Sequence, residues 1–150
     1  MSESMIRRLD ENDIHLIAQY LQNDRFDCCE FNDFWTPEEL YEWLKLNKDI
    51  CIGCYIQDNL VGFCLSHFFE NANKIYLENI FVDSEYRNRG IASDLLTTLL
   101  SMYTENHPEK TLRFVALVDA TNDKVIKLLK KRGFNVGDQM LWVQKNCSRT

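Results

Sequence analysis

Apolar and polar residues recur along this chain with two periods, which divide it into short strands and amphipathic helices. The apolar run at residues 5–9 predicts a first strand. A helix is expected next, because apolar residues recur there with helical spacing behind Asp10 or Asn12, either of which can cap it. The residues expected on the buried face of this helix are Ile14, Ile17, Ala18 and Leu21.

The second predicted helix has a well-marked start. Thr36 can cap it, Pro37 fits the first helical position, where no N–H is needed, and Glu39 can reach back to complete a capping box. The residues expected on its buried face are Leu40, Trp43 and Leu44.

Three strands are predicted in the middle of the chain. Residues 50–56 and 60–68 form two of them around a turn at Asp58 and Asn59, as in a β-hairpin. Residues 74–82 alternate in character, which predicts a strand with two distinct faces. One face is expected to carry Ile75, Leu77 and Phe81, and the other Tyr76, Glu78, Ile80 and Val82.

The last third of the chain predicts two helices and two or three strands. Residues 92–103 have the clearest helical periodicity, and residues 122–132 predict a helix closed by Gly133. The apolar run 112–118 predicts a strand buried on both faces, and further strands are expected at 140–144 and near 134–137. This order predicts one α/β (α+β) domain over residues 1–150, with helices packed on a central mixed sheet.

Composition and length exclude several classes of protein. Of the 150 residues, 45% are hydrophobic and 27% are charged, which is an ordinary balance for one globular domain. No apolar run approaches the roughly 18 residues of a transmembrane helix. The N-terminal residues lack the basic and apolar regions of a secretory signal. A cytoplasmic protein without a membrane partner is therefore expected.

The charge and the cysteines limit the partners further. A net charge of −6 disfavours nucleic acid, whose binding depends on a basic face, and favours small cations or basic peptides. The six cysteines are expected to be free thiols in a reducing compartment. Cys51 and Cys54 have zinc-ligand spacing, but residues three apart on a strand point to opposite faces, and no second ligand pair follows. No metal site is expected.

The segment between the strand at 74–82 and the strongest helix carries the clearest chemical signal. Gly90 can adopt a positive φ and lets the main chain approach a bulky anion. The first N–H groups of the next helix lack intrahelical partners, and Arg87 and Arg89 add positive charge beside them. Together these features predict a phosphate site. The alternative is a basic turn that only begins a helix.

This segment differs from two common phosphate loops. No Gly-Lys-Ser/Thr follows it, as a Walker loop requires, and Ala92 replaces a glycine of the dinucleotide pattern. Instead, the run Arg87-Asn88-Arg89-Gly90-Ile91-Ala92 resembles the Arg/Gln-x-x-Gly-x-Gly/Ala signature of the GNAT superfamily of N-acetyltransferases. A second landmark of that family, an Asn-led helix ending in Gly-Phe, is similar to the stretch from Asn122 to Gly133-Phe134.

The resemblance covers residues 50–134 best and implies a fold, a cosubstrate and a set of binding residues. The implied fold is a mixed, mostly antiparallel sheet of six to seven strands flanked by about four helices. The implied cosubstrate is acetyl-CoA, with its pyrophosphate on the signature loop and its pantetheine arm paired with a splayed strand before the loop. The implicated residues are Ile80, Phe81, Val82, Arg87, Asn88, Arg89, Gly90, Ile91, Ala92, Ser93 and Asn122.

Glu78 is the candidate base. An attacking amine must lose a proton, and in several members of the family a glutamate at a comparable place removes it. The alternative is a solvated or salt-bridged strand carboxylate. The family often has a tyrosine on the Asn-led helix to protonate the departing thiolate, but Leu129 stands there. His67 is a secondary base candidate, and nothing in the spacing selects among the chain's tyrosines as a replacement acid.

Residues 23–42 combine seven carboxylates with aromatic side chains, which suits a cationic acceptor. Within this segment, Asp24, Asp27 and Glu30 are spaced to share one helix face. The alternative is a solvated acidic face over an aromatic core.

Three functions therefore stay open. The first is an acetyl-CoA-dependent N-acetyltransferase acting on a primary amine of a small molecule or peptide, with an amide of Phe81 or Val82 stabilising the oxyanion. The second is an acyl-CoA-binding regulatory or sensor module with little turnover, suggested by Leu129. The third is a site for another phosphate-bearing ligand, such as a nucleotide. The chain is expected to be a monomer or a homodimer.

Overall fold

The computed structural model describes residues 3–23, 35–118, 120–141, 143, 145 and 147–148. The chain divides into two compact units. The first consists of Met1–Arg25 and Phe34–Leu117, and the second of Phe26–Asp33 and Val118–Thr150.

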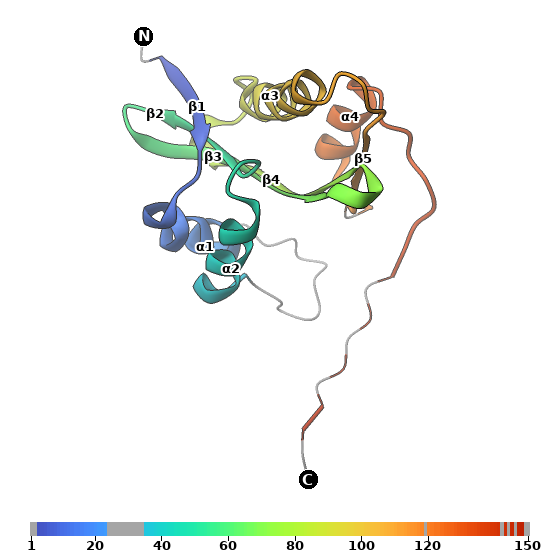
Figure 1. Ribbon diagram of the computed structural model, residues 1–150. Coiled ribbons are helices and arrows are strands. Elements are labelled where there is room, and N and C mark those ends of the chain that lie inside the picture. Colours follow the sequence, from blue (N-terminus) through green and yellow to red (C-terminus); the bar gives the residue numbers. More distant parts are fainter. Residues whose placement is uncertain are drawn as a thin grey trace. The chain divides into compact units, whose positions relative to one another are not determined.

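The first unit is built on a five-stranded sheet whose strands lie in the order β1-β2-β3-β4-β5 (Figure 1). Neighbouring strands are antiparallel from β1 to β4, and β4 pairs with β5 in parallel. The strands are β1 (Ser4–Arg8), β2 (Ile52–Ile56), β3 (Asn59–Phe69), β4 (Lys74–Val82) and β5 (Arg113–Ala116). The mixed, mostly antiparallel sheet predicted from the sequence is confirmed.

The predicted number of strands, six to seven, is wrong, because the described residues form only five. Residues 134–137 lie outside any strand, and so do positions 140, 141 and 143 of the strand expected at 140–144. The apolar side chains there, Met140, Leu141 and Val143, are exposed. Apolar residues alone do not make a strand, since a strand also needs a hydrogen-bonded neighbour.

Three helices belong to the first unit: α1 (Ile14–Asn23), α2 (Pro37–Asn47) and α3 (Ile91–Asn106). α1 and α2 lie on one side of the sheet, and α3 lies on the other (Figure 1). Short 3-10 turns precede or follow several elements: η1 (Glu11–Asp13), η2 (Glu70–Ala72) and η3 (Ser84–Tyr86).

The helix starts follow the sequence closely. Thr36 caps α2 by accepting a hydrogen bond from the N–H of Glu39 at 3.1 Å, and Pro37 is the first helical residue, as predicted. The second hydrogen bond of the predicted capping box, from the N–H of Thr36 to the Glu39 side chain, is not among the contacts described for this cap. Asp10 caps the η1 turn that leads into α1, and Asp13 completes a capping box with it.

The β2–β3 hairpin turns one residue earlier than predicted. Ile56 pairs with Asn59, so the two turn residues are Gln57 and Asp58. Both have positive φ, 52° and 63°, as a type I′ turn requires. The sequence pointed to Asp58 and Asn59 because both tolerate this conformation well.

β4 carries one extra residue relative to β3. Leu65 pairs with Asn79, but Ser66 pairs with Leu77, so that Glu78 has no partner on β3. An inserted residue of this kind is a β-bulge, which bends a strand and re-aims its side chains.

The bulge changes which β4 side chains share a face. Ile75 pairs with Phe68, whose ring lies 5.1 Å from that of Tyr103 on α3, so Ile75 and Leu77 face α3. Phe81 instead belongs to the apolar core under α1 and α2. The prediction that Ile75, Leu77 and Phe81 share one face is therefore wrong for Phe81, because a regular alternation leaves no room for a bulge.

The two cysteines with zinc-ligand spacing lie on opposite faces of the sheet, as predicted. Cys51 belongs to the core under α1 and α2, whereas Cys54 pairs with Gly62, which faces α3. Both are buried free thiols. Among the described residues, no three histidine, cysteine or carboxylate side chains are grouped to hold a metal ion.

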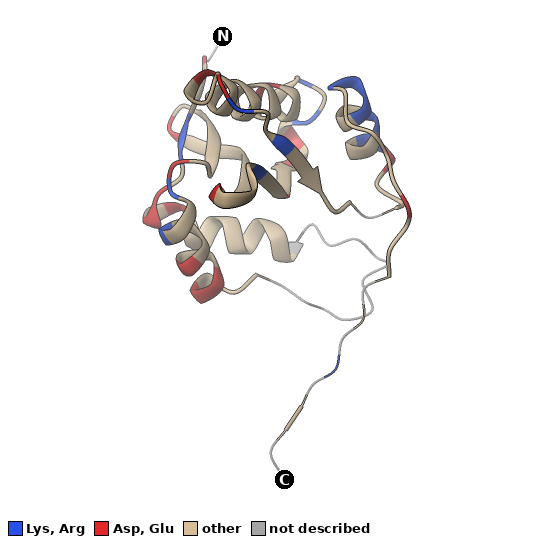
Figure 2. Ribbon diagram, turned by 45° about the vertical axis from the view of Figure 1, so that its right-hand side comes forward, with Lys and Arg blue, Asp and Glu red and all other residues tan. Residues whose placement is uncertain are grey.

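The described part of the second unit contains α4 (Asp123–Lys131), which matches the helix predicted at 122–132. Asn122 caps it by accepting from the N–H of Val125 at 3.4 Å, and Gly133 follows it with a φ of 90°. Lysines are frequent on this helix, whereas η1 and α2 of the first unit carry carboxylates (Figure 2). No helix in the described ranges has the length and apolar character that crossing a bilayer requires.

β5 is shorter and less buried than predicted. The apolar run 112–118 contributes only Arg113–Ala116 to the sheet. Arg113 is exposed, and the other three residues are half-buried. The run was expected to be buried on both faces, but it is an edge strand that pairs only with β4 in the described sheet.

Candidate functional site

The parallel pair β4–β5 opens half-way along β4. Pairing runs from Lys74 with Arg113 to Leu77 with Ala116 and ends there, although β4 continues to Val82. The second half of β4 therefore has a strand neighbour on the β3 side only, within the described residues. Such a half-paired strand offers main-chain N–H and C=O groups to an extended ligand.

The register determines which main-chain groups face this opening. The N–H of Asp83 donates to the carbonyl of Val61 at 2.8 Å, toward β3. Because successive residues of a strand direct their main-chain groups to alternate edges, Phe81 also faces β3, whereas Ile80 and Val82 face the opening. Of the three residues predicted from the sequence, the strand thus presents Ile80 and Val82 and turns the main chain of Phe81 away.

The loop after β4 ends in a glycine whose conformation other residues rarely adopt. Gly90 has a φ of 83° and is the N-cap of α3, and having no side chain it cannot itself cap the helix. A Cβ placed on Gly90 would have nothing within 4 Å, so the space beside the loop is open. Asn88 also has a positive φ, 65°. The main chain at the start of α3 is therefore curved and accessible, as an anion site requires.

Both arginines of the loop are held by main-chain carbonyls. Arg87 donates from Nε to the carbonyl of Val82 at 2.8 Å, and its guanidinium lies 5.8 Å from the centre of the Phe81 ring. Arg89 donates to the carbonyl of Glu85 at 3.4 Å and lies over the ring of Tyr86. These contacts fix positive charge beside the N-terminus of α3.

α1 braces the start of this loop through Tyr20. The Tyr20 hydroxyl contacts the carboxylate of Asp83 at 3.1 Å and the carbonyl of Leu60 at 3.0 Å. Its ring packs on Phe81 at 5.0 Å. Burial, with help from Asp83, raises the pKa of Tyr20 to about 12, so the hydroxyl keeps its proton. Sequence reasoning missed Tyr20 because its partners are far along the chain.

Glu78 is the extra residue of the bulge, and it is also the first residue of β4 beyond the pairing with β5. Its side chain is half-buried, and burial raises the pKa of its carboxyl, although the nearby Tyr76 hydroxyl lowers it. Burial also raises the pKa of Tyr76 to about 12, and the negative charge of Glu78 adds to the shift. The two side chains are within hydrogen-bonding reach of each other.

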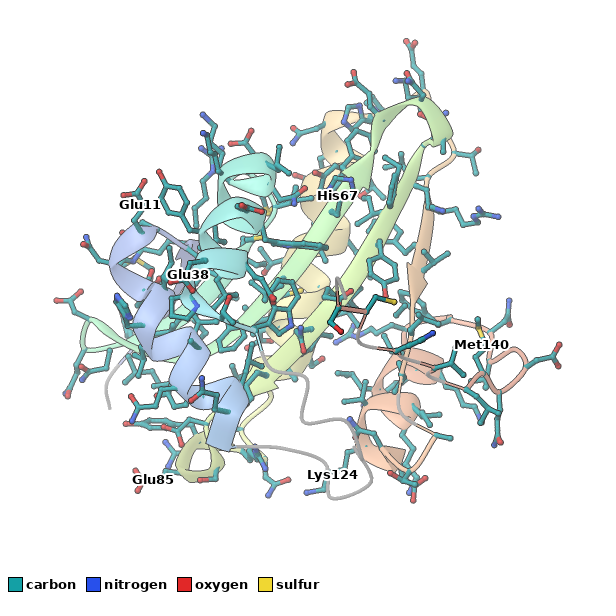
Figure 3. The ribbon with its side chains drawn as sticks, turned by 90° about the horizontal axis from the view of Figure 1, so that it is seen from below. Glu11, Glu38, His67, Glu85, Lys124 and Met140 are labelled. Carbon is teal, nitrogen blue, oxygen red and sulfur yellow. The ribbon has the colours of Figure 1, made fainter. Side chains whose placement is uncertain are left out.

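His67, the secondary base candidate, is held in one orientation by a buried amide. Asn47, which is 4% exposed, donates from Nδ2 to the carbonyl of Trp43 at 3.0 Å, so its Oδ1 faces His67. The Nδ1 of His67 lies 2.7 Å from this oxygen and must therefore be the donor. His67 pairs with Tyr76 across the sheet, whereas Glu85 lies near the opposite end of β4 (Figure 3).

Comparison with known proteins identifies the family. The model of the acetyltransferase (GNAT) family matches residues 17–134.

The chain belongs to the GNAT acetyltransferase family.

Individual relatives of this GNAT chain are distant. The spermine/spermidine N(1)-acetyltransferase of Bacillus subtilis (strain 168) is 25% identical over 95 residues. That match covers 59% of this chain and 61% of the relative, so the chain spans less than two thirds of the length of that protein.

Solved structures show the same fold. An N-acetyltransferase from Staphylococcus aureus Mu50 has a TM-score of 0.71 at 25% identity, covering 89% of this chain and 84% of its own. The diaminobutyrate acetyltransferase EctA from Paenibacillus lautus, in complex with L-2,4-diaminobutyric acid and coenzyme A, has a TM-score of 0.67 at 20% identity. That likeness covers 88% of this chain and 75% of the other.

The remaining predicted site residues of this GNAT chain lie in the second unit or outside the described residues. The Asn122 side chain is used as the cap of α4, and Leu129 lies on the same helix. Asp24, Asp27 and Glu30, expected to share one helix face, lie outside the described residues.

Two carboxylates of the acidic segment and one from η1 line an open groove of about 510 Å³ beside α1 and α2. They are Glu11, Glu38 and Glu42, joined there by His15 and Tyr41. Glu11 and Glu38 therefore lie near each other, at the α1 and α2 part of the first unit (Figure 3).

Sequence reasoning left Tyr76 among several tyrosines of equal standing. The structure distinguishes Tyr76 from the other tyrosines, because its hydroxyl is near Glu78. Tyr103, by contrast, lies on α3 and contacts Phe68 on the opposite face of the sheet. Spacing alone could have suggested the pair, since residues two apart on a strand share a face.

Proposed function

We propose that this GNAT chain is an acetyl-CoA-dependent N-acetyltransferase that transfers the acetyl group directly to a primary amine of a small molecule or peptide. The observation that carries the proposal is the combination of a half-paired β4 with a curved loop at its end that opens a helix. An extended arm that ends in a pyrophosphate needs both, in this order along the chain. Acetyl-CoA is the cosubstrate that has this shape.

The geometry of the loop and strand supports the following binding roles. Main-chain groups from Arg87 to Ser93 and the two arginines hold the pyrophosphate. Ile80 and Val82 pair with the pantetheine arm, with Phe81 behind them in the core. The Val82 carbonyl already accepts from Arg87, so its N–H is the group of that residue left for the arm or for the oxyanion. Asn122 is the proposed contact from the second unit.

Glu78 is the proposed base. The acceptor amine is mostly protonated near neutral pH and must lose a proton before or as it attacks the thioester. A half-buried carboxylate with a raised pKa is a better proton acceptor than an exposed one. Its place at the first residue of β4 beyond the pairing with β5 supports a role beside the arm of the cosubstrate.

The acceptor is proposed to be cationic. The chain carries a net charge of −6, and carboxylates line the groove beside α1 and α2. The named activity of the Bacillus subtilis relative, on spermine and spermidine, supports the same direction. The same charge disfavours nucleic acid as a partner. We place the enzyme in the cytoplasm as a monomer or homodimer.

A second candidate function is an acyl-CoA sensor with little turnover. Leu129 favours this candidate. Members of the GNAT family often have a tyrosine at this position to protonate the leaving thiolate, and a leucine side chain cannot do so.

Two measurements separate the candidates. Acetyl-CoA and CoA are expected to raise the thermal midpoint of the protein, and ATP is not. Thiol release from acetyl-CoA is then followed with spermidine, 2,4-diaminobutyrate and a peptide with a free N-terminus. Binding with turnover on at least one amine supports the enzyme, and binding with no turnover on any supports the sensor. A midpoint unchanged by millimolar acetyl-CoA contradicts both.

A further inference from the structure

We propose that Tyr76 is the acid of the reaction: it passes a proton to the departing thiolate and recovers one from Glu78. This inference rests on the proposed acetyl transfer and names a catalytic residue for it.

Tyr76 lies where the two strands part. It pairs with Val115 on β5, and the pairing ends one residue later, at Leu77. Glu78 follows in the bulge, and its carboxylate is within hydrogen-bonding reach of the Tyr76 hydroxyl. Residues two apart on a strand share a face, so the two side chains lie on the same side of β4.

The side chain of Tyr76 lies on the α1 and α2 side of the sheet. Tyr76 pairs with His67, whose ring contacts Trp43 of α2 at 5.8 Å. Directly paired residues share a face, so the Tyr76 side chain is on the α1 and α2 side. Within β4, whose residues 74–82 are all described, Tyr76 is the one tyrosine.

The protonation states suit the two roles. Burial and the Glu78 charge keep the Tyr76 hydroxyl protonated, with a pKa of about 12. A free thiol has a pKa of about 8.5, so proton transfer from Tyr76 alone to a thiolate would be energetically unfavourable. Protonated Glu78 removes this difficulty, because a carboxylic acid is a stronger acid than a thiol. The net transfer from Glu78 through Tyr76 to sulfur is therefore downhill.

The proposed step conserves atoms and charge. The amine nitrogen attacks the thioester carbon, and its proton goes to the Glu78 carboxylate. As the carbon–sulfur bond breaks, sulfur keeps the electron pair and takes the hydroxyl proton of Tyr76. The Tyr76 phenolate then takes the proton held by the neighbouring Glu78 carboxyl. Both side chains return to their starting states, and the products are the acetylated amine and free CoA thiol.

Tyr76→Phe tests the proposal, because it removes the hydroxyl and leaves the ring. The expected result is a kcat lowered by about 10²-fold, the usual size of an acid–base contribution, with acetyl-CoA still raising the thermal midpoint. Tyr103→Phe is the matched control. It removes a hydroxyl whose pKa is also raised to about 12 but which lies on the α3 side of the sheet, so its kcat is expected to equal that of the wild type.

The pH profile separates an acid from a residue that only adjusts Glu78. Tyr76 lowers the pKa of Glu78, so its loss moves the acidic limb of the rate to higher pH. If that were its whole role, Tyr76→Phe would reach the wild-type kcat on the plateau above this limb. We expect the deficit to persist there. Recovery to within about threefold of wild type overturns the assignment of Tyr76 and leaves the proposed function standing.

Two further outcomes complete the test. A wild-type protein that neither binds acetyl-CoA nor releases thiol overturns the proposed function and this inference together. Should Tyr76→Phe not fold, replacing Tyr76 with 3,5-difluorotyrosine, whose phenol is more acidic, tests the same hydroxyl. The alkaline limb of kcat is then expected to move to lower pH, and an unmoved limb overturns the assignment.

Discussion

Gly90 shows how a single residue can serve the fold and the site at once. Its φ of 83° is strained for any side chain, although a Cβ there would meet no atom within 4 Å. Gly90→Ala is therefore expected to cost about 1 kcal/mol through backbone strain without a clash, and to weaken acetyl-CoA binding by distorting the loop. Denaturant unfolding and a binding titration measure the two effects.

Gly133→Ala is the matched control for Gly90→Ala. Gly133 has a φ of 90°, and a Cβ placed on it would likewise meet no atom within 4 Å. The same loss of stability is expected, with acetyl-CoA affinity unchanged. Equal losses of affinity in the two variants would contradict a specific role for the loop.

The raised pKa of Glu78 predicts how kcat/KM depends on pH. Because burial raises the pKa of its carboxyl, kcat/KM is expected to fall with decreasing pH from a higher value than the ordinary glutamate pKa of about 4.3. In Glu78→Gln the rate should be lower by about 10²-fold at neutral pH, and this acidic limb should vanish. Glu70→Gln, at an exposed carboxylate on η2, controls for the loss of charge. An unchanged limb in Glu78→Gln removes Glu78 as the base.

Elements with local signals could be predicted from the sequence, and those set by neighbours could not. Thr36 and Pro37 define the start of α2 through their own chemistry, and Asn122 and Gly133 bracket α4 in the same way. The strand order and the bulge at Glu78 depend instead on pairing with distant residues. The loop of the site was therefore predictable, whereas the bulge at Glu78 and the point at which β5 leaves β4 were not.

The cap of α4 gives a prediction at the scale of one element. Asn122→Ala is expected to destabilise α4 by about 1 kcal/mol, because the N–H of Val125 loses its acceptor. Hydrogen exchange of the α4 amides should accelerate accordingly. Asn122→Ser keeps a capping oxygen, so exchange should stay slow. If Asn122 also contacts the cosubstrate, the serine variant will lose acetyl-CoA affinity, and unchanged affinity would limit Asn122 to its role as a cap.

At the scale of the whole molecule, several hydroxyls and thiols of the described core have raised pKa values. Tyr20, Tyr76 and Tyr103 have pKa values raised to about 12, and burial raises that of Cys51 to about 11 and that of Cys64 as well. Every one of these groups is neutral when protonated. The folded protein therefore tolerates acid at these positions and is sensitive to base.

The sign of this sensitivity follows from proton binding. In the unfolded chain, thiols titrate near about 8.5 and tyrosines near about 10, so between these values and the raised folded values the native state binds more protons. Stability must then fall as the pH rises. The contribution of the raised pKa values is complete below the unfolded values and is lost progressively as the pH approaches 11 for Cys51 and 12 for the tyrosines.

The thermal midpoint, measured in reductant, should decline steadily from about pH 8.5 upward. Tyr103→Phe removes one of these groups and should make the decline above about pH 10 shallower. A midpoint that stays level through that range in the wild type would contradict the burial on which the pKa shifts depend.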